Sequence, residues 1–107
     1  MGITIIKKNR DFRKVFSHGK SKAGKSLVVY RLSNGSDKRR FGFSVSKKIG
    51  NAVVRNRVRR ILKEICRLNE DQFEAGYDYV IVARPAVTKS NYHSLGQSLL
   101  SLVRELE

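Results

Sequence analysis

The fold is organised around residues 46–68, which read SKKIGNAVVRNRVRRILKEICRL. After a lysine pair and a turn at Gly50-Asn51, the pattern predicts one continuous helix. At roughly 100° per residue, its apolar side chains share an arc of about 120°. These side chains are Val54, Val58, Ile61, Leu62, Ile65 and Leu68. The sequence therefore predicts a helix that buries one side in a core and exposes the other.

The exposed side of this helix is strongly basic. It carries Arg55, Arg57, Arg59, Arg60, Lys63 and Arg67. Like charges four residues apart repel each other by roughly a few tenths of a kcal/mol per pair, and only Glu64 relieves this repulsion. We interpret the repulsion that remains as the sign of a polyanionic partner.

The charge of the chain is uneven. Its 107 residues carry a net charge of +14, but residues 1–60 hold 18 Lys/Arg against 2 Asp/Glu, whereas residues 61–107 hold 5 against 7. Solubility needs no more than about 8 charges of one sign, so we interpret the basic part as a surface for nucleic acid. A hydrophobic content of 40% excludes wholesale disorder. We therefore predict one nucleic-acid-binding domain over residues 1–107.

The cellular compartment is indicated by cysteine usage and hydropathy. One cysteine, Cys66, excludes an internal disulfide and suits a reducing cytoplasm. It lies near the edge of the apolar arc, where we expect a half-buried structural thiol. No apolar run approaches the roughly 20 residues of a membrane span, and the N-terminus lacks the apolar core of a signal peptide. The expectation is a cytoplasmic protein with no membrane partner.

A short helix is expected before the basic one. Asn9 is its predicted N-cap and Gly19 its end, and Phe12, Val15 and Phe16 fall on one face. By composition alone, we interpret both phenylalanines as core residues.

The next segment predicts a β-hairpin. Lys20–Lys25 is expected to be a mobile basic connector, Leu27–Leu32 a strand, and Arg40–Ser46 its partner across an Asn34-Gly35 turn. In Arg40–Ser46, glycine and serine alternate with apolar residues. One face of this strand is therefore shallow, and a strand or an RNA backbone could approach it closely.

The remaining elements complete an α+β fold. Asn69–Gly76 is expected to be a polar loop, and the apolar run Tyr77–Ala83 is typical of a central strand. A final helix, capped by Ser90, covers the sheet. We predict a small mixed four-stranded sheet packed with three helices in a sandwich. The hairpin and the central strand supply three strands, so the fourth must come from Ile3–Ile6 or the stretch near Lys22.

Catalytic motifs are absent from the sequence. His18 and His93 are far apart and have no motif around them, and the acids lack the paired spacing that demands a metal. No Cys/His cluster, P-loop or dinucleotide-binding glycine motif is present. The residues themselves thus indicate a binding module with no catalytic residue and no metal ligand.

One long motif identifies a family. Residues 44–60, SVSKKIGNAVVRNRVRR, resemble the signature of the bacterial ribonuclease P protein, whose RNR motif matches Arg55-Asn56-Arg57. Asp11–Phe16 is similar to that family's first helix, and Tyr30 and Tyr79–Arg84 fall where its strands are expected. The resemblance covers nearly the whole chain.

This resemblance implies a function. The family assists a large catalytic RNA that removes the 5′ leader from precursor tRNA with Mg²⁺ held mainly by the RNA, so the polypeptide alone is not expected to be catalytic. Carried over, the residues that bind the catalytic RNA are Lys47, Lys48, Asn51, Arg55, Asn56, Arg57, Arg59, Arg60, Lys63 and Arg67. The family's cleft for the single-stranded leader maps onto Phe12, Lys14, Phe16 and Tyr30, where aromatic rings can stack on bases. This implication partly reverses the core-only interpretation of the phenylalanines.

The resemblance also implies a left-handed βαβ crossover around the basic helix, an exception to the right-handed rule, and weak self-association. Family members often carry basic extensions at both ends, and their contacts are not carried over to this chain.

Two other classes remain open. A ribosomal or architectural RNA-binding protein would use the same basic face without a leader cleft. Alanine at Phe16 or Tyr30 would then leave its affinity for precursor and mature tRNA unchanged. A protein-only nuclease would need clustered acids, and loss of Glu64 or Asp78 would abolish its cleavage without added RNA.

Overall fold

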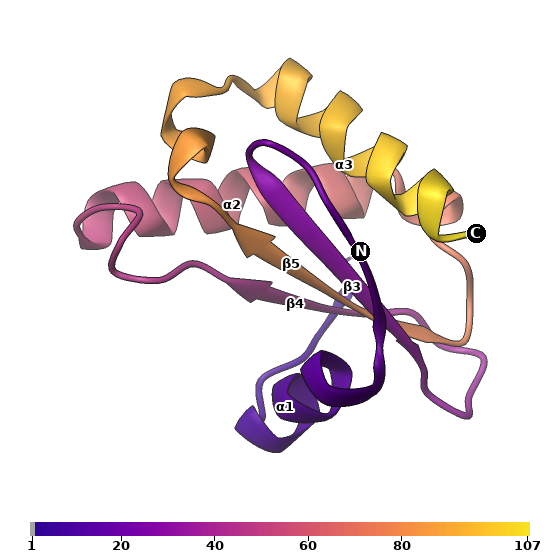
Figure 1. Cartoon of the computed structure of the whole chain (residues 1–107). Coiled ribbons are helices and arrows are strands. Elements are labelled where there is room, and N and C mark those ends of the chain that lie inside the picture. The colour runs from indigo at the N-terminus through magenta and orange to yellow at the C-terminus, as the bar shows by residue number, and fades with distance from the viewer. Residues whose placement is uncertain (1) are drawn as a thin grey trace.

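The computed structural model describes residues 2–107 as helices and strands with two short 3-10 helices (Figure 1). In chain order these elements are β1 (Thr4–Ile5), α1 (Asn9–His18), β2 (Lys20–Ala23), β3 (Leu27–Ser33), β4 (Arg40–Ser44), α2 (Ala52–Leu68), η1 (Glu70–Gln72), β5 (Tyr77–Ala83), η2 (Pro85–Lys89) and α3 (Tyr92–Leu106). Within the same residues, no helix has both the length and the apolar character that crossing a membrane requires.

The strands of residues 2–107 form one mixed sheet in the order β1-β4-β5-β3-β2. β4 and β5 are parallel neighbours connected by α2, whereas β3 is antiparallel to both β5 and β2. The predicted α+β class is confirmed, with five strands in place of four, because both candidate segments form edge strands. The prediction of a mobile connector is wrong, since Lys20–Ala23 pairs with β3. The left hand of the β4-α2-β5 crossover stays a prediction of the resemblance.

The predicted hairpin between β3 and β4 is wrong, because β5 lies between these strands. Their connection wraps around Gly76, which precedes β5. The Asn34 N–H donates to the Gly76 carbonyl at 2.9 Å, and the Gly76 N–H donates to the Lys38 carbonyl at 3.0 Å. Gly76 has a φ of 86°, and a Cβ there would lie 2.9 Å from the Ser36 carbonyl oxygen. The connection therefore crosses the start of β5, so β4 does not fold back to pair with β3.

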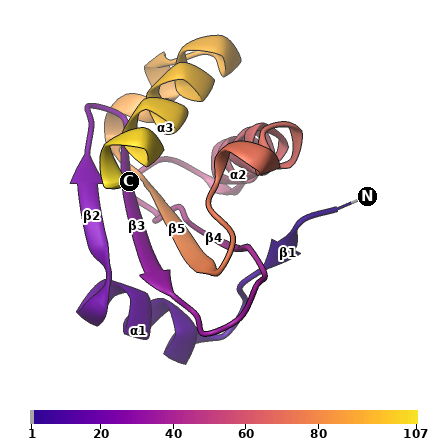
Figure 2. The ribbon, with the colours of Figure 1, turned by 90° about the vertical axis from the view of Figure 1, so that its right-hand side faces the viewer.

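One face of the sheet is packed against α2 and α3, and we call it the sealed face (Figure 2). Its fully buried strand residues are Leu27, Val29, Phe41, Tyr79 and Ile81. From α2, Val58, Leu62, Ile65 and Cys66 pack against them. Cys66 is fully buried, not half-buried as predicted, and this burial raises the pKa of its thiol. Leu68, the last residue of α2, is 56% exposed, so the apolar arc ends before it.

The predicted polar loop contains an unexpected core residue. Phe73 follows η1 and is fully buried, with its ring edge-on to those of Phe41 at 4.9 Å and Tyr79 at 5.0 Å. A single apolar residue in a polar segment has no periodicity, which explains why the pattern missed it.

The helix ends follow capping chemistry. Asn51 caps α2 by accepting a hydrogen bond from the Val54 N–H, as its place in the turn suggests. Asn91, not the predicted Ser90, caps α3 in a capping box with Ser94. Lys8 stands at the N-cap of α1, with Asn9 already helical, while Gly19 ends that helix as predicted.

Candidate nucleic-acid interface

The face of the sheet opposite the sealed face is covered by α1 alone among the described elements, and we call it the open face (Figure 2). Strand register arranges its side chains in rows across β4, β5 and β3. One row consists of Gly42, Val80 and Tyr30, and the next of Ser44, Val82 and Val28. α1 lies over the first row, whereas the second row stays partly exposed beside it. A groove therefore lies between α1 and the carboxyl end of β4.

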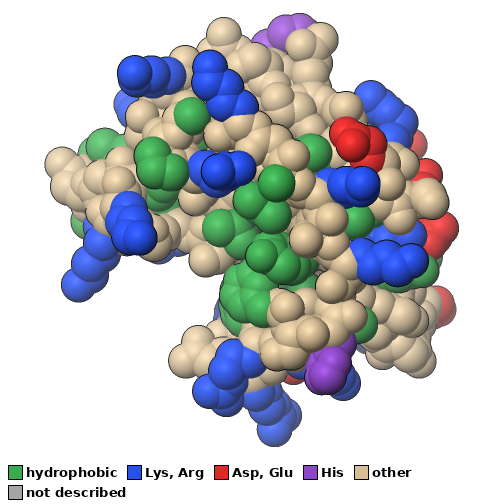
Figure 3. Space-filling view, viewed as in Figure 1, with side chains coloured by type: hydrophobic (Ala, Val, Ile, Leu, Met, Phe, Trp, Pro, Cys, Tyr) green, Lys and Arg blue, Asp and Glu red, His purple; other side chains and the backbone are tan. Residues whose placement is uncertain are grey.

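This groove is aromatic on the side formed by α1. A hollow of about 470 Å³ in it is lined by Asn9, Phe12, Arg13, Phe16, Phe43 and Ser44, and we call it the aromatic groove. Phe16 is 41% exposed, and its ring meets that of Tyr30 edge-on at 4.9 Å. Figure 3 shows hydrophobic side chains gathered at the centre of one face of the molecule, with Lys and Arg side chains around them.

The predicted leader-cleft residues are brought together only in part. Phe12, Phe16 and Tyr30 form one aromatic cluster, since the Phe12 and Phe16 rings also lie 6.4 Å apart. Lys14 is exposed but does not line the groove; Arg13 does. At 100° per residue Lys14 lies about 160° from Phe16, whereas Arg13 lies about 60° away. Helical periodicity could thus have pointed to Arg13.

The two phenylalanines have different environments. Phe16 is exposed, so the interpretation of both rings as core residues is wrong for it. Phe12 is half-buried, and its ring lies over Gly42, where an added Cβ would approach it to 2.8 Å. The strand face that we predicted to be shallow is therefore filled at Gly42 by Phe12, whereas Ser44 is partly exposed and Ser46 is exposed.

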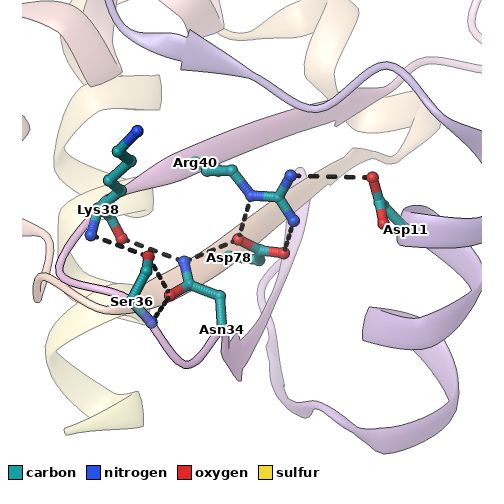
Figure 4. A network of polar contacts seen from close by, with 6 residues as sticks. All are labelled: Asp11, Asn34, Ser36, Lys38, Arg40 and Asp78. Carbon is teal, nitrogen blue, oxygen red and sulfur yellow. Dashed lines mark hydrogen bonds and ion pairs between the residues drawn. The ribbon is translucent and has the colours of Figure 1, made fainter.

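A polar network links α1 to the starts of β4 and β5 (Figure 4), whereas the groove lies at the end of β4. Arg40 on β4 donates to both carboxylate oxygens of Asp78 on β5, at 2.8 and 2.6 Å, and lies 3.8 Å from Asp11 of α1. The Asn34 side-chain amide donates to Asp78 at 3.0 Å. Hydrogen bonding to Asp78 raises the pKa of Arg40, so its charge is retained at any physiological pH. The network connects α1, β4 and β5 and so positions one wall of the groove.

The turn between β4 and α2 presents two predicted RNA-binding lysines. Lys47 and Lys48 are exposed, while Ile49 next to them is buried and anchors the turn. Arg55 donates to the Gly50 carbonyl at 2.8 Å, and Arg59 donates to the Val45 carbonyl at 3.3 Å. These two arginines thus help to hold the turn against α2.

Polar and basic residues of α2 and of the turn before it are together called the basic face, which consists of Lys47, Lys48, Asn51, Arg55, Asn56, Arg57, Arg59, Arg60, Lys63 and Arg67. In the described part of the chain, no side-chain hydrogen bond engages Arg57, Arg60 or Lys63, which are all exposed. Asn56 accepts from Arg59 at 2.9 Å. The structure therefore offers three uncommitted cations and several oriented ones along one helix.

Arg67 differs from the other arginines of this face. It donates to both carboxylate oxygens of Glu64, at 2.7 and 2.8 Å, which lowers the pKa of Glu64 and raises that of Arg67. An arginine that is already paired has less to gain from a phosphate. Among residues 2–107, no group of three or more His, Cys, Asp or Glu side chains could hold a metal ion.

Comparison with known proteins gives one consistent result. A family model described as Ribonuclease P matches residues 4–107. The chain is 48% identical over 103 residues to the ribonuclease P protein component of Clostridioides difficile, covering 95% of this chain and 90% of that protein. It is 45% identical over 102 residues to that of Alkaliphilus metalliredigens, covering 95% and 92%.

Solved structures show the same likeness. The RNase P protein of Thermotoga maritima superposes with a TM-score of 0.88 at 31% identity, covering 95% of this chain and 96% of that one. The RNase P protein of Staphylococcus aureus superposes with a TM-score of 0.87 at 34% identity, covering 94% and 93%.

Proposed function

The chain belongs to the ribonuclease P protein family, and from this premise we propose that its basic face binds the catalytic RNA and its aromatic groove binds the 5′ leader of precursor tRNA. As a ribonuclease P protein component, it is a subunit of an endoribonuclease in tRNA processing. We further propose that it acts in the cytoplasm, where its precursor tRNA substrates are made.

The basic face supports binding to a structured RNA. Arg57, Arg60 and Lys63 have no internal partner among the described residues, so pairing with phosphates costs them no existing hydrogen bond. The turn that carries Lys47 and Lys48 is already held by Arg55 and Arg59. This pre-organisation lowers the entropy lost when RNA binds.

The aromatic groove supports binding to a single strand. Its wall offers the exposed ring of Phe16, braced by Tyr30, and its rim offers the Arg13 cation. Unstacked bases are recognised by such rings, whereas the paired bases of a duplex are not accessible to them. A hollow of about 470 Å³ has room for splayed bases.

We assign the Mg²⁺ of the reaction to the RNA partner. The described carboxylates form no group that could hold a metal, so this chain would contribute positive charge and orientation instead. Its Lys and Arg side chains lower the repulsion between the phosphates of two RNA molecules. The precursor would then bind at a lower Mg²⁺ concentration than the catalytic RNA alone requires.

One observation carries this function: the groove and the basic face meet at the same end of β4. Ser44 ends β4 in the groove, and residues 45–51 lead directly into α2. A leader in the groove and a catalytic RNA on α2 would therefore be held next to each other. An architectural RNA-binding protein has no need of this arrangement.

The test is cleavage of a precursor tRNA at low Mg²⁺ by a bacterial catalytic RNA, with and without this protein. We expect cleavage at the mature 5′ end only when both are present. Phe16→Ala should reduce the preference for precursor over mature tRNA about tenfold, because base–aromatic stacking contributes about 1–3 kcal/mol per base. Leu68→Ala, which removes another exposed apolar side chain, is the matched control and should change nothing.

Other results would reject the proposal. Cleavage by the protein alone would make it a nuclease, and no stimulation would leave a basic RNA-binding domain. An equal loss for both tRNAs with Phe16→Ala would return that ring to a structural role.

A further inference from the structure

A second exposed aromatic ring lies across the sheet from the aromatic groove. Tyr92, the first residue of α3, is 43% exposed, close to the 41% of Phe16. In the described residues, these two are the aromatic side chains among the large exposed hydrophobics. α1 and α3 lie on opposite sides of the sheet (Figure 2), so Tyr92 cannot belong to the groove that contains Phe16.

Tyr92 stands between two hollows along the line where α2 meets α3. The first, of about 380 Å³, is lined by Arg60, Ile61, Glu64 and Tyr92. The second, of about 260 Å³, is lined by Ile65, Asn69, Tyr92, His93, Gly96, Gln97 and Leu100. A Cβ at Gly96 would meet nothing within 4 Å, so the second hollow is open at that point. The ring is thus reachable from both sides.

The first hollow is lined by one basic and one acidic side chain, Arg60 and Glu64. Arg60 and Lys63 are exposed and make no side-chain hydrogen bond within residues 2–107, whereas both oxygens of Glu64 are held by Arg67. The acids Glu70 and Asp71 belong to η1, which follows Asn69 of the second hollow, and neither of them lines the first hollow. An exposed aromatic ring beside uncommitted cations matches a nucleotide, whose base stacks and whose phosphate pairs.

We propose that the hollow beside Tyr92 binds one unpaired nucleotide of the catalytic RNA, with the base on the Tyr92 ring and the phosphate on Arg60. The inference rests on the proposed function, because Arg60 belongs to the basic face. It adds a base-stacking site on α3 to the phosphate contacts proposed for α2. A second copy of this chain fits the hollow poorly, since each copy carries a net charge of +14.

Salt dependence separates a stacking contact from a phosphate contact. Removing one phosphate contact reduces the slope of log affinity against log salt concentration by about 0.7–0.9, whereas removing a stacking contact leaves this slope unchanged. We therefore expect Tyr92→Ala to weaken binding of the catalytic RNA about tenfold at every salt concentration. Tyr92→Phe, which keeps the ring, should bind like the unchanged protein. Arg60→Gln should lower the slope.

Two controls fix the meaning of this measurement. Leu68→Ala removes an exposed apolar side chain at the end of α2 that lines neither hollow, and it should not change the affinity. Arg57→Gln should lower the salt slope if the basic face binds RNA at all. An unchanged slope for Arg57→Gln would reject the proposed function, whereas full affinity for Tyr92→Ala together with a lowered slope for Arg57→Gln would reject this inference alone.

Cross-linking gives a readout that needs no variant. Ultraviolet irradiation of the complex with the catalytic RNA, followed by trypsin and mass spectrometry, should find a nucleotide on the peptide of residues 90–104, which contains Tyr92. No adduct on that peptide would overturn the proposal. A change in self-association with Tyr92→Ala, with RNA affinity unchanged, would also overturn it and assign the hollow to a second copy.

Discussion

The two faces of the same five-stranded sheet are used in opposite ways. The sealed face is closed by α2 and α3 over a fully buried cluster, whereas the open face has α1 alone among the described elements and leaves Phe16 in solvent. Both faces carry apolar side chains, although β4 contributes Phe41 to the sealed face and Gly42 and Ser44 to the open one. The difference is the area that helices cover: one face is filled and stabilises the fold, and the other is left partly bare and can accept a ligand.

The largest expected effect is on the sealed face. Phe41→Ala removes a fully buried ring that contacts Phe73 and Tyr79, and such truncations cost about 3–5 kcal/mol. We expect the free energy of unfolding, measured by urea denaturation, to fall by that amount. Phe16→Ala on the open face should lower it by less than about 1 kcal/mol, since the ring is already exposed. Comparable losses for the two variants would show that the faces do not differ as described.

A smaller loss of stability is expected from a substitution in β4, whose residues alternate between the two faces. Gly42→Ala places a Cβ 2.8 Å from the Phe12 ring, so this ring, which forms part of the groove wall, must shift. Overpacking of this kind costs about 1–3 kcal/mol. The displaced wall should also reduce the preference of the holoenzyme for precursor over mature tRNA, measured as the ratio of the two dissociation constants.

Gly96→Ala on α3 is the control for that variant. Nothing lies within 4 Å of a Cβ at this position, and alanine favours a helix over glycine by about 1 kcal/mol. We expect it to stabilise the fold slightly and to leave the preference for precursor unchanged. An unaltered preference in Gly42→Ala would mean that the position of the Phe12 ring does not set the groove.

The same contrast explains what the sequence could and could not predict. Periodicity located α2, the buried strand β5 and the aromatic face of α1, because each repeats a pattern over several residues. It failed for the pairing of β3 with β5, which depends on a connection wrapped around the single residue Gly76. It also failed for Phe73, which is buried through contacts with residues distant in the chain.

The candidate site shows the same limit. The RNR motif and the aromatic residues Phe12, Phe16 and Tyr30 could be assigned from the resemblance. The groove is lined by Arg13 and not by the predicted Lys14, because of the way α1 is rotated over the sheet. That rotation is set by contacts such as Phe12 on Gly42, which join segments 30 residues apart in the sequence.

The smallest expected changes in stability come from two ion pairs, one on each face, and they give the most direct comparison of the faces. Asp11→Asn removes a carboxylate that lies 3.8 Å from Arg40 and helps to hold α1 on the open face. Glu74→Gln removes a carboxylate that lies 3.4 Å from Arg31, whose guanidinium also donates to the Leu106 carbonyl and so holds α3 on the sealed face. Both ion pairs are partly exposed, so each change should lower the free energy of unfolding by less than about 1 kcal/mol.

The two variants should nevertheless differ in function. Both raise the net charge by one, so any general gain in RNA affinity is shared. Only Asp11→Asn loosens a wall of the aromatic groove, and we expect it to reduce the preference for precursor over mature tRNA by about twofold to fivefold, the equivalent of less than about 1 kcal/mol. If Glu74→Gln reduced this preference equally, the effect would come from charge or overall stability, and the Asp11–Arg40–Asp78 network would have no particular role in positioning α1. A loss confined to Asp11→Asn would show that the attachment of α1 to the sheet sets leader recognition.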